Sequence, residues 1–146
     1  MHLDLKPENI FIRNDVYMIG DFGMTKTSEE WKSYKGPAFG TRGYMAPEQF
    51  NKNMKKLPKT DIWAFGCLAH FILFGTLVYY DNFVERIAYK LAYEEYEMPS
   101  ETLAGDEVNE NLRDLLCKCF IKDPENRIDF FELKNHKVII LGNLKI

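Results

Sequence analysis

Short apolar runs separated by polar residues mark the first twenty positions of the chain. Two such runs, residues 10–12 and 16–19, are rich in the branched and aromatic side chains that strands favour. Arg13, Asn14 and Asp15 join them, and a short polar link between two apolar runs predicts a β-hairpin. Because a hairpin returns the chain to its starting point, the residues just before and just after it are expected to be neighbours.

Polar residues without apolar periodicity fill residues 23–44. This stretch is rich in Ser, Thr, Lys and Gly, and it is far longer than a connection between two elements needs to be. Long loops in compact domains usually carry function. We therefore expect a functional loop in this part of the chain.

Apolar positions recur at helical spacing from about residue 60 onward. The first predicted helix begins with Thr60 or Asp61 as its N-cap and ends near Gly75. The same spacing predicts three further helices, at residues 82–93, at residues 109–121 and, briefly, after Asp129. With the hairpin, these helices predict an α+β fold that is mostly α-helical.

The run from Ile62 to Tyr80 contains no charged residue and almost reaches the length of a membrane span. Gly66, His70 and Gly75 interrupt its apolar character. A helix that is apolar on every side is also what the centre of a helical domain requires, so we favour a buried core helix with His70 as a core histidine. A single-pass membrane protein is the alternative.

Composition and charge narrow the function classes. The 146 residues suffice for one domain with a core, and a net charge of −3 without a dense basic face excludes a typical nucleic-acid binder. Two charged groups each predict either a solvated face or a docking surface for a charged partner. The basic group is Arg42, Lys52, Lys55, Lys56 and Lys59; the acidic group is Glu94, Glu95, Glu97, Glu101, Asp106, Glu107 and Glu110.

The three cysteines form neither a disulfide framework nor a metal-ligand pattern. Cys67 lies in an apolar run, and Cys117 and Cys119 stand two residues apart without the further ligands of a zinc site. We expect buried or half-buried reduced thiols. With no recognisable secretory leader, the sequence favours an intracellular protein, cytoplasmic or nuclear, without a membrane partner.

Four polar side chains flank the predicted hairpin and suit one kind of chemistry. The hairpin brings Asp21 near Asn9, so that both could offer oxygen to a hard cation such as Mg²⁺. Asp4 is then free to accept a proton, and Lys6 can neutralise a phosphate oxygen. Phosphoryl transfer needs this combination of positioning and charge neutralisation.

Six short motifs in one order make the chain resemble the C-terminal lobe of a eukaryotic-type protein kinase. They are HLDLKPEN at residues 2–9, DFG at 21–23, GTRGYM at 40–45, APE at 46–48, DIWAFG at 61–66 and KDPENR at 122–127. The resemblance implies a partial kinase domain over residues 1–136 and a C-terminal tail over residues 137–146. The Asp-Leu-Lys of the first motif is similar to that of serine/threonine kinases.

This resemblance implies a serine/threonine protein kinase, a transferase that moves the γ-phosphate of ATP to a hydroxyl of a protein substrate with the help of Mg²⁺. Asp4 would orient or deprotonate that hydroxyl, and Lys6 would contact the transferred phosphate. Asn9 and Asp21 would hold Mg²⁺. Phe11 would form part of the floor beneath the adenine.

Other matched positions imply supporting roles near the substrate. Thr41 would brace Asp4 and Lys6. Tyr44 would help to shape the pocket for the residue that follows the phospho-acceptor. Asp61 would accept hydrogen bonds from the backbone of the catalytic loop.

The resemblance also implies contacts inside the lobe. Glu48 would form a buried ion pair with Arg127, and the ring of His2 would stack on Phe22. Leu3 departs from the pattern, because most members of the family have an arginine there that binds a phosphate on the activation loop. This departure concerns regulation rather than catalysis.

The six motifs include no Gly-rich loop, strand lysine or adenine hinge, all of which precede the catalytic loop in the family. We therefore expect an N-lobe supplied by a longer chain or by a partner, and negligible kinase activity from these residues alone. An apolar surface should be exposed where the family's preceding helix would cover it. The alternative is a catalytically inactive mimic of a kinase C-lobe that acts as a binding or regulatory module.

Overall fold

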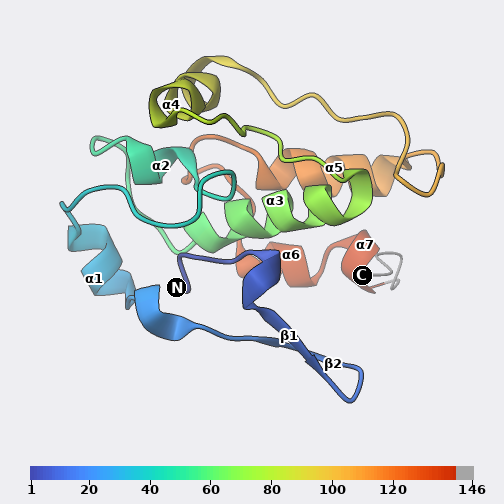
Figure 1. The fold of residues 1–146 in the computed structure, drawn as a ribbon, viewed down its shortest axis with the longest axis horizontal. Coiled ribbons are helices and arrows are strands. Elements are labelled where there is room, and N and C mark those ends of the chain that lie inside the picture. Colours follow the sequence, from blue (N-terminus) through green and yellow to red (C-terminus); the bar gives the residue numbers. More distant parts are fainter. Residues whose placement is uncertain (141–146) are drawn as a thin grey trace.

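The computed structural model describes residues 1–140, which form a mostly helical body and one small antiparallel sheet (Figure 1). In chain order the elements are η1 (Pro7–Asn9), β1 (Ile10–Arg13), β2 (Val16–Ile19), η2 (Phe22–Met24), α1 (Ser28–Ser33), α2 (Pro47–Phe50), α3 (Thr60–Phe74), α4 (Val84–Tyr93), α5 (Glu110–Cys119), α6 (Phe130–Lys134) and α7 (Lys137–Ile140). The η elements are short 3₁₀-helices. The predicted α+β class with mainly helical content is confirmed.

Strands β1 and β2 form the predicted hairpin. Ile10 pairs with Ile19 and Arg13 pairs with Val16, so the link between the strands is only two residues long. Both link residues have positive φ, as expected for a tight hairpin turn whose twist matches that of its strands. The hairpin leaves the body of the molecule as a separate projection (Figure 1).

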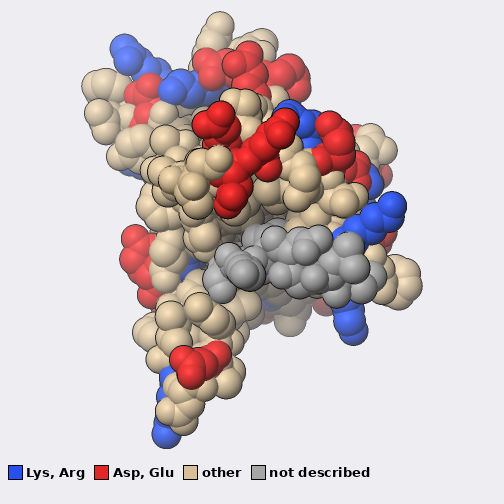
Figure 2. Space-filling model, turned by 90° about the vertical axis from the view of Figure 1, so that its right-hand side faces the viewer, with Lys and Arg blue, Asp and Glu red and all other residues tan. Residues whose placement is uncertain are grey.

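Most apolar side chains of this projection are exposed. They are Phe11, Ile12, Val16, Tyr17, Met18 and Ile19, followed by Phe22 and Met24 of η2. Figure 2 shows the hairpin as a narrow, mostly uncharged projection below the body, while acidic side chains gather on the upper part of the same face. Exposed apolar side chains therefore concentrate on the hairpin and η2.

Helix α3 is the centre of the helical body, with most of its residues buried. Gly75 ends it in a left-handed conformation, and its N–H donates to the carbonyl of Phe71 at 2.8 Å. Gly66 allows a close approach to α5, because a Cβ at this position would lie 2.8 Å from the Cβ of Cys119. His70 is buried, and its Nδ1 lies 2.9 Å from the carbonyl oxygen of Thr76, as expected for a core histidine.

Two apolar clusters pack on either side of this helix. The larger one is centred on Trp63, which stacks on Tyr79 and meets Phe120 edge to face. The smaller one includes Ile62, Leu115 and Val138 and joins α3 to α5 and α7. In residues 1–140, no helix combines the length and the apolar character needed to cross a membrane.

Several local expectations are corrected by the structure. Lys59 is the N-cap of α3, while Thr60 and Asp61 lie in its first turn and bond elsewhere. The stretch of residues 23–44 is not all loop, since it contains part of η2 and all of α1. Cys117 is exposed rather than buried. Of the expected C-terminal tail, residues 137–140 form α7, and residues 141–146 lie outside the described part of the chain.

Candidate active site

Asp4 lies at the centre of a hydrogen-bond network that joins the first residues of the chain to the loop before α2. Its Oδ1 accepts hydrogen bonds from the backbone N–H and the hydroxyl of Thr41 at 2.8 and 2.7 Å. Its Oδ2 lies 2.8 Å from Nζ of Lys6, which also donates to the Thr41 hydroxyl at 2.7 Å. Asp4, Lys6 and Thr41 therefore form one closed polar triangle.

Opposing effects act on the ionisation of this triangle. Burial alone would raise the pKa of Asp4, but hydrogen bonds from Lys6 and Thr41, with the Lys6 charge, hold that pKa below its ordinary value. The hydrogen bond with Asp4 raises the pKa of Lys6, and the charges of Glu8 and Asp21 act in the same direction. Asp4 is therefore a carboxylate and Lys6 an ammonium ion at neutral pH.

Asp61, in the first turn of α3, holds the backbone beside this triangle. Its two carboxylate oxygens accept hydrogen bonds from the N–H groups of His2 and Leu3 at 2.7 and 2.8 Å. Leu3 has a φ of 68°, a conformation that costs a leucine about 1–2 kcal/mol. The bonds to Asp61 offset this strain, so the expected contact between this carboxylate and the backbone of residues 2–3 is present.

The open end of the hairpin brings Asn9 and the segment before Asp21 together. The N–H of Gly20 donates to the carbonyl of Asn9 at 2.9 Å, one step beyond the last strand pair. Asn9 is buried and donates its side-chain N–H to the carbonyl of Asp4 at 2.8 Å. Its amide oxygen has no hydrogen-bond partner among residues 1–140, so it is available as a ligand.

Asp21 supplies the second oxygen donor near this corner. It is exposed, it has a φ of 59°, and its carboxylate accepts one long bond of 3.3 Å from the N–H of Gly23. One carboxylate and one amide oxygen, both largely free, form the kind of hard-oxygen set that Mg²⁺ prefers. The residues present therefore fit a divalent cation held between Asn9 and Asp21.

The remaining predicted nucleotide and substrate residues lie in two places, Phe11 on the hairpin and Tyr44 in a hollow lined also by Asp4 and Thr41. Phe11, on β1, lies against Gly20 and is 52% exposed, so about half of its side chain is left uncovered by residues 1–140. Tyr44 is buried, and burial raises the pKa of its hydroxyl to about 12. His2 meets Phe22 edge to face, with ring centres 5.3 Å apart, and its Nε2 lies 2.9 Å from the carbonyl oxygen of Gly20.

The expected ion pair between Glu48 and Arg127 lies in the core. Two hydrogen bonds of 2.7 and 2.9 Å join the guanidinium to the carboxylate, and neither side chain is exposed to solvent. This pair joins α2 to the turn between α5 and α6. Within residues 1–140, neither side chain forms a hydrogen bond with Asp4, Lys6 or Thr41.

Sequence reasoning missed one connection between the long polar stretch and the core. Trp31 of α1 is buried, and its indole N–H donates to the hydroxyl of Thr60 at 3.1 Å. The Thr60 hydroxyl in turn donates to Glu48 at 2.9 Å. The signal that could have predicted α1 is Thr27-x-x-Glu30, whose side chains form a capping box at its N-terminus.

Comparison with known proteins agrees with this geometry. The family description "Protein kinase domain" matches residues 1–139. The chain is 31% identical to serine/threonine-protein kinase cds1 of Schizosaccharomyces pombe, with 92% of this chain and 30% of the relative covered. It is 32% identical to a probable myosin light chain kinase of Dictyostelium discoideum, with 95% and 28% covered. It is 33% identical to CBL-interacting protein kinase 26 of Oryza sativa, with 91% and 26% covered.

The chain thus spans less than a third of the length of these relatives. The family match nevertheless extends over almost every described residue. It includes the Asp4 triangle, the open end of the hairpin and the buried ion pair. The chain therefore belongs to the protein kinase family.

Proposed function

We propose that these residues are the phosphoryl-transfer half of a serine/threonine protein kinase. The observation that supports this best is the polar triangle of Asp4, Lys6 and Thr41 beside the oxygen donors of Asn9 and Asp21. The arrangement offers a proton acceptor, a cation for phosphate oxygens and a place for a metal ion. Phosphoryl transfer depends on such positioning and charge neutralisation rather than on covalent chemistry by the protein.

In this proposal, the hydroxyl of the protein substrate binds beside the carboxylate of Asp4. Its carboxylate is ionised at neutral pH and fixed by Thr41, so it can orient the hydroxyl and take its proton as the bond to phosphorus forms. Lys6 stays charged and neutralises an oxygen of the transferred group. Thr41 fixes the side chains of Asp4 and Lys6 through its hydroxyl. Tyr44 helps to form the wall of the substrate pocket beside them.

Asn9 and Asp21 would hold Mg²⁺, and Phe11 would lie beneath the adenine of ATP. When bound, the cation would neutralise charge on the nucleotide phosphates. The serine/threonine preference rests on the Asp-Leu-Lys sequence of the loop and on the names of the relatives. The rest of the nucleotide site would come from an N-lobe, in a longer chain or in a partner.

Metal binding is tested first, because it needs no second lobe. Mn²⁺ is titrated into the isotopically labelled chain, and paramagnetic broadening of backbone amides is recorded by NMR. The proposal predicts broadening centred on residues 9 and 20–23, which Asp21→Asn abolishes. Asp15→Asn is the matched control, since Asp15 is an exposed aspartate in the hairpin turn with the same φ of 59°. Broadening that persists in the Asp21 variant would contradict the assignment.

Transfer is tested with labelled ATP, Mg²⁺ and serine, threonine and tyrosine peptides, using the chain alone and joined to an N-lobe from a relative. We expect negligible turnover from the chain alone. The joined protein should phosphorylate serine or threonine, and Asp4→Asn should lower kcat by about 10²–10⁴-fold while Asp15→Asn leaves it unchanged. A well-folded joined protein that binds the nucleotide but transfers nothing would favour a regulatory module instead.

A further inference from the structure

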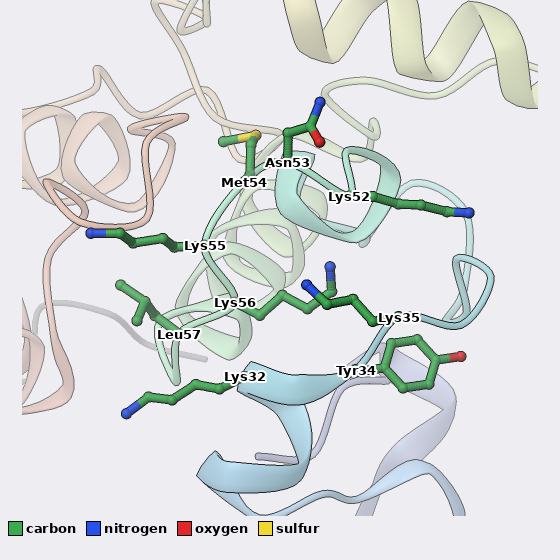
Figure 3. A pocket seen from close by; sticks show the side chains of 9 residues that line it. All are labelled: Lys32, Tyr34, Lys35, Lys52, Asn53, Met54, Lys55, Lys56 and Leu57. Carbon is green, nitrogen blue, oxygen red and sulfur yellow. The ribbon is translucent and has the colours of Figure 1, made fainter.

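A cavity of about 380 Å³ opens between α1 and the connection from α2 to α3. It shares no residue with the Asp4 triangle or the hairpin. Nine residues line it; none is acidic and five are lysines, namely Lys32, Lys35, Lys52, Lys55 and Lys56. Figure 3 shows that these lysines come from two separate segments of the chain. Such a concentration of one charge is notable in a chain whose net charge is −3.

Lys56 is the one buried lysine of this cavity, and it has no ion-pair partner within residues 1–140. Only 9% of its surface is exposed, and its ammonium group lies over the ring of Trp31, 5.5 Å from the ring centre. It makes no ion pair or hydrogen bond with any residue from 1 to 140 through its side chain. A buried ammonium ion normally pairs with an acid, whereas the contact given for this one is the face of an aromatic ring.

Burial and neighbouring positive charges both disfavour the charged form of Lys56. Burial lowers the pKa of Lys56, and the positive charges of Lys35 and Lys52 act in the same direction. Glu48 opposes this effect, but its two oxygens are already bound by Arg127. The positive charges of Lys35 and Lys52 therefore act against that of Lys56 across the cavity.

The lysines do not all face the same way. In Figure 3 the ammonium groups of Lys35 and Lys56 end beside each other, and Lys52 extends along the same side of the cavity. Lys55 and Lys32 point toward the opposite side. Lys55 is already paired with Glu125, whose carboxylate lies 2.5 Å from its ammonium nitrogen. No ion pair joins Lys32, Lys35, Lys52 or Lys56 to an acid within residues 1–140, and the last three lie on one side of the cavity.

We propose that this cavity binds a phosphate dianion through Lys35, Lys52 and Lys56. A dianionic phosphate has enough charge and enough acceptor oxygens to engage several ammonium groups at once, whereas a single carboxylate has one charge. The volume is within the range of about 300–1,000 Å³ that ligand pockets occupy. A nucleic acid is a poorer match, because its phosphates need a continuous basic track rather than one pocket.

The phosphate could belong to a phosphorylated side chain of a protein partner or be free inorganic phosphate. Both present the same dianion to the lysines, and the experiment separates them. Either ligand would hold α1 against the connection before α3 by cancelling the repulsion between their lysines. This inference rests on the cavity alone and stands apart from the phosphoryl-transfer proposal.

The test is a calorimetric titration of the whole 146-residue chain at about 0.15 M ionic strength, where diffuse surface attraction is screened. The probes are a neutral peptide with one phosphoserine, the same peptide with serine, the same peptide with glutamate, and inorganic phosphate. Saturable one-to-one binding of the phosphopeptide, at least about tenfold tighter than that of the serine or glutamate peptide, supports the proposal. Inorganic phosphate that binds as tightly as the phosphopeptide assigns the site to the free ion.

Three variants locate the binding. Lys56→Met keeps the packing on Trp31 but removes the charge, and Lys35→Gln combined with Lys52→Gln changes only exposed residues. Each should weaken binding by about tenfold or more, in line with the loss of charged hydrogen bonds. Lys55→Gln removes the same charge from the neighbouring residue and should change the dissociation constant less than twofold, an estimate based on its pairing with Glu125.

Clear outcomes would overturn the assignment. One is binding weaker than about 10 mM for both phosphate probes, and another is equal affinity for the phosphoserine and glutamate peptides. A third is equal weakening by Lys55→Gln and by the double variant, which would indicate diffuse charge rather than a pocket. A fourth is tighter, salt-dependent binding of single-stranded RNA, which would make nucleic acid the partner. The exposed double variant keeps the test valid if Lys56→Met does not fold.

Discussion

Glu48 and Arg127 are 79 residues apart in the chain and meet through two parallel hydrogen bonds in the core. Arg127 uses its other N–H groups on the carbonyl oxygens of Lys59, Ile121 and Lys122. The carboxylate also accepts the hydroxyl of a threonine in the first turn of α3. Each charge is satisfied by the other. Removing one partner should therefore destabilise the fold by far more than the intact pair stabilises it.

Replacing Arg127 by Met should therefore lower the free energy of unfolding by about 3–5 kcal/mol, because Glu48 would remain buried without its cation. Urea denaturation followed by circular dichroism at pH 7 measures this change. The matched control is Lys55→Gln, which breaks an exposed ion pair with Glu125 and should cost no more than about 1 kcal/mol. Similar losses in both variants would show that burial of the pair is unimportant.

Asp61→Asn should loosen the first residues of the chain. The amide can accept only one of the two backbone N–H groups now bound by the carboxylate, which leaves the other unsatisfied next to the strained Leu3. We expect a loss of about 1–3 kcal/mol and faster hydrogen exchange at residues 2–5. Mass spectrometry of exchanged peptides gives the second readout. Asp106→Asn, at an exposed position, should change neither quantity, and unchanged exchange in the Asp61 variant would refute the prediction.

His70 should make stability depend on pH. Burial lowers its pKa from the ordinary value of 6.5, although the bond to the Thr76 carbonyl opposes this. A histidine with a lowered folded-state pKa contributes stability that is fully present above the unfolded-state pKa and is lost as pH falls through the folded-state pKa. The loss therefore occurs below about pH 6.5.

The effect of His70 can be separated from that of the carboxylates by comparing the chain with its His70→Gln variant in urea at pH 7.5 and pH 5. The unmodified chain should lose more unfolding free energy on acidification than the variant, since only its residue 70 gains a proton on unfolding, which stabilises the unfolded state. Equal losses would mean that residue 70 binds the same number of protons in the folded and unfolded states, which would contradict a lowered folded-state pKa.

Ile12 and Tyr17 pair across the hairpin and are 63% and 57% exposed. Changing both to Thr should alter the free energy of unfolding by about 1 kcal/mol or less, because little apolar burial is lost. Binding of an apolar fluorescent dye should fall markedly, since the exposed face contributes the apolar surface. A large destabilisation would show that the hairpin is more tightly packed than its exposure indicates.

The fold was predictable where periodicity and turn chemistry agree. The hairpin follows from two apolar runs around Asn14 and Asp15, and the helices around α3 follow from their apolar spacing. Helix α1 was not predicted, because a six-residue helix with a single buried Trp31 leaves no periodic pattern. Its capping box was the only local signal.

The candidate site was predictable in its residue types but not in its contacts. Position in the motifs indicated that Thr41 and Asp61 support the first loop, whereas the distances depend on a fold that only long-range packing sets. The basic group gave no hint that Lys56 is buried while Lys55 is paired on the surface. Adjacent residues in an irregular segment can point to opposite sides, and no periodic pattern in the sequence shows which of them faces the core.

The attachment of Trp31 to the core also changes the entropy of the long stretch between η2 and α2. Closing a flexible loop costs conformational entropy, and this cost grows slowly with the number of residues in the loop. Because Trp31 is fixed to Thr60, the stretch behaves as two short closures instead of one long one. Ordering or modifying residues on one side of Trp31 should therefore leave the conformational freedom of the other side almost unchanged.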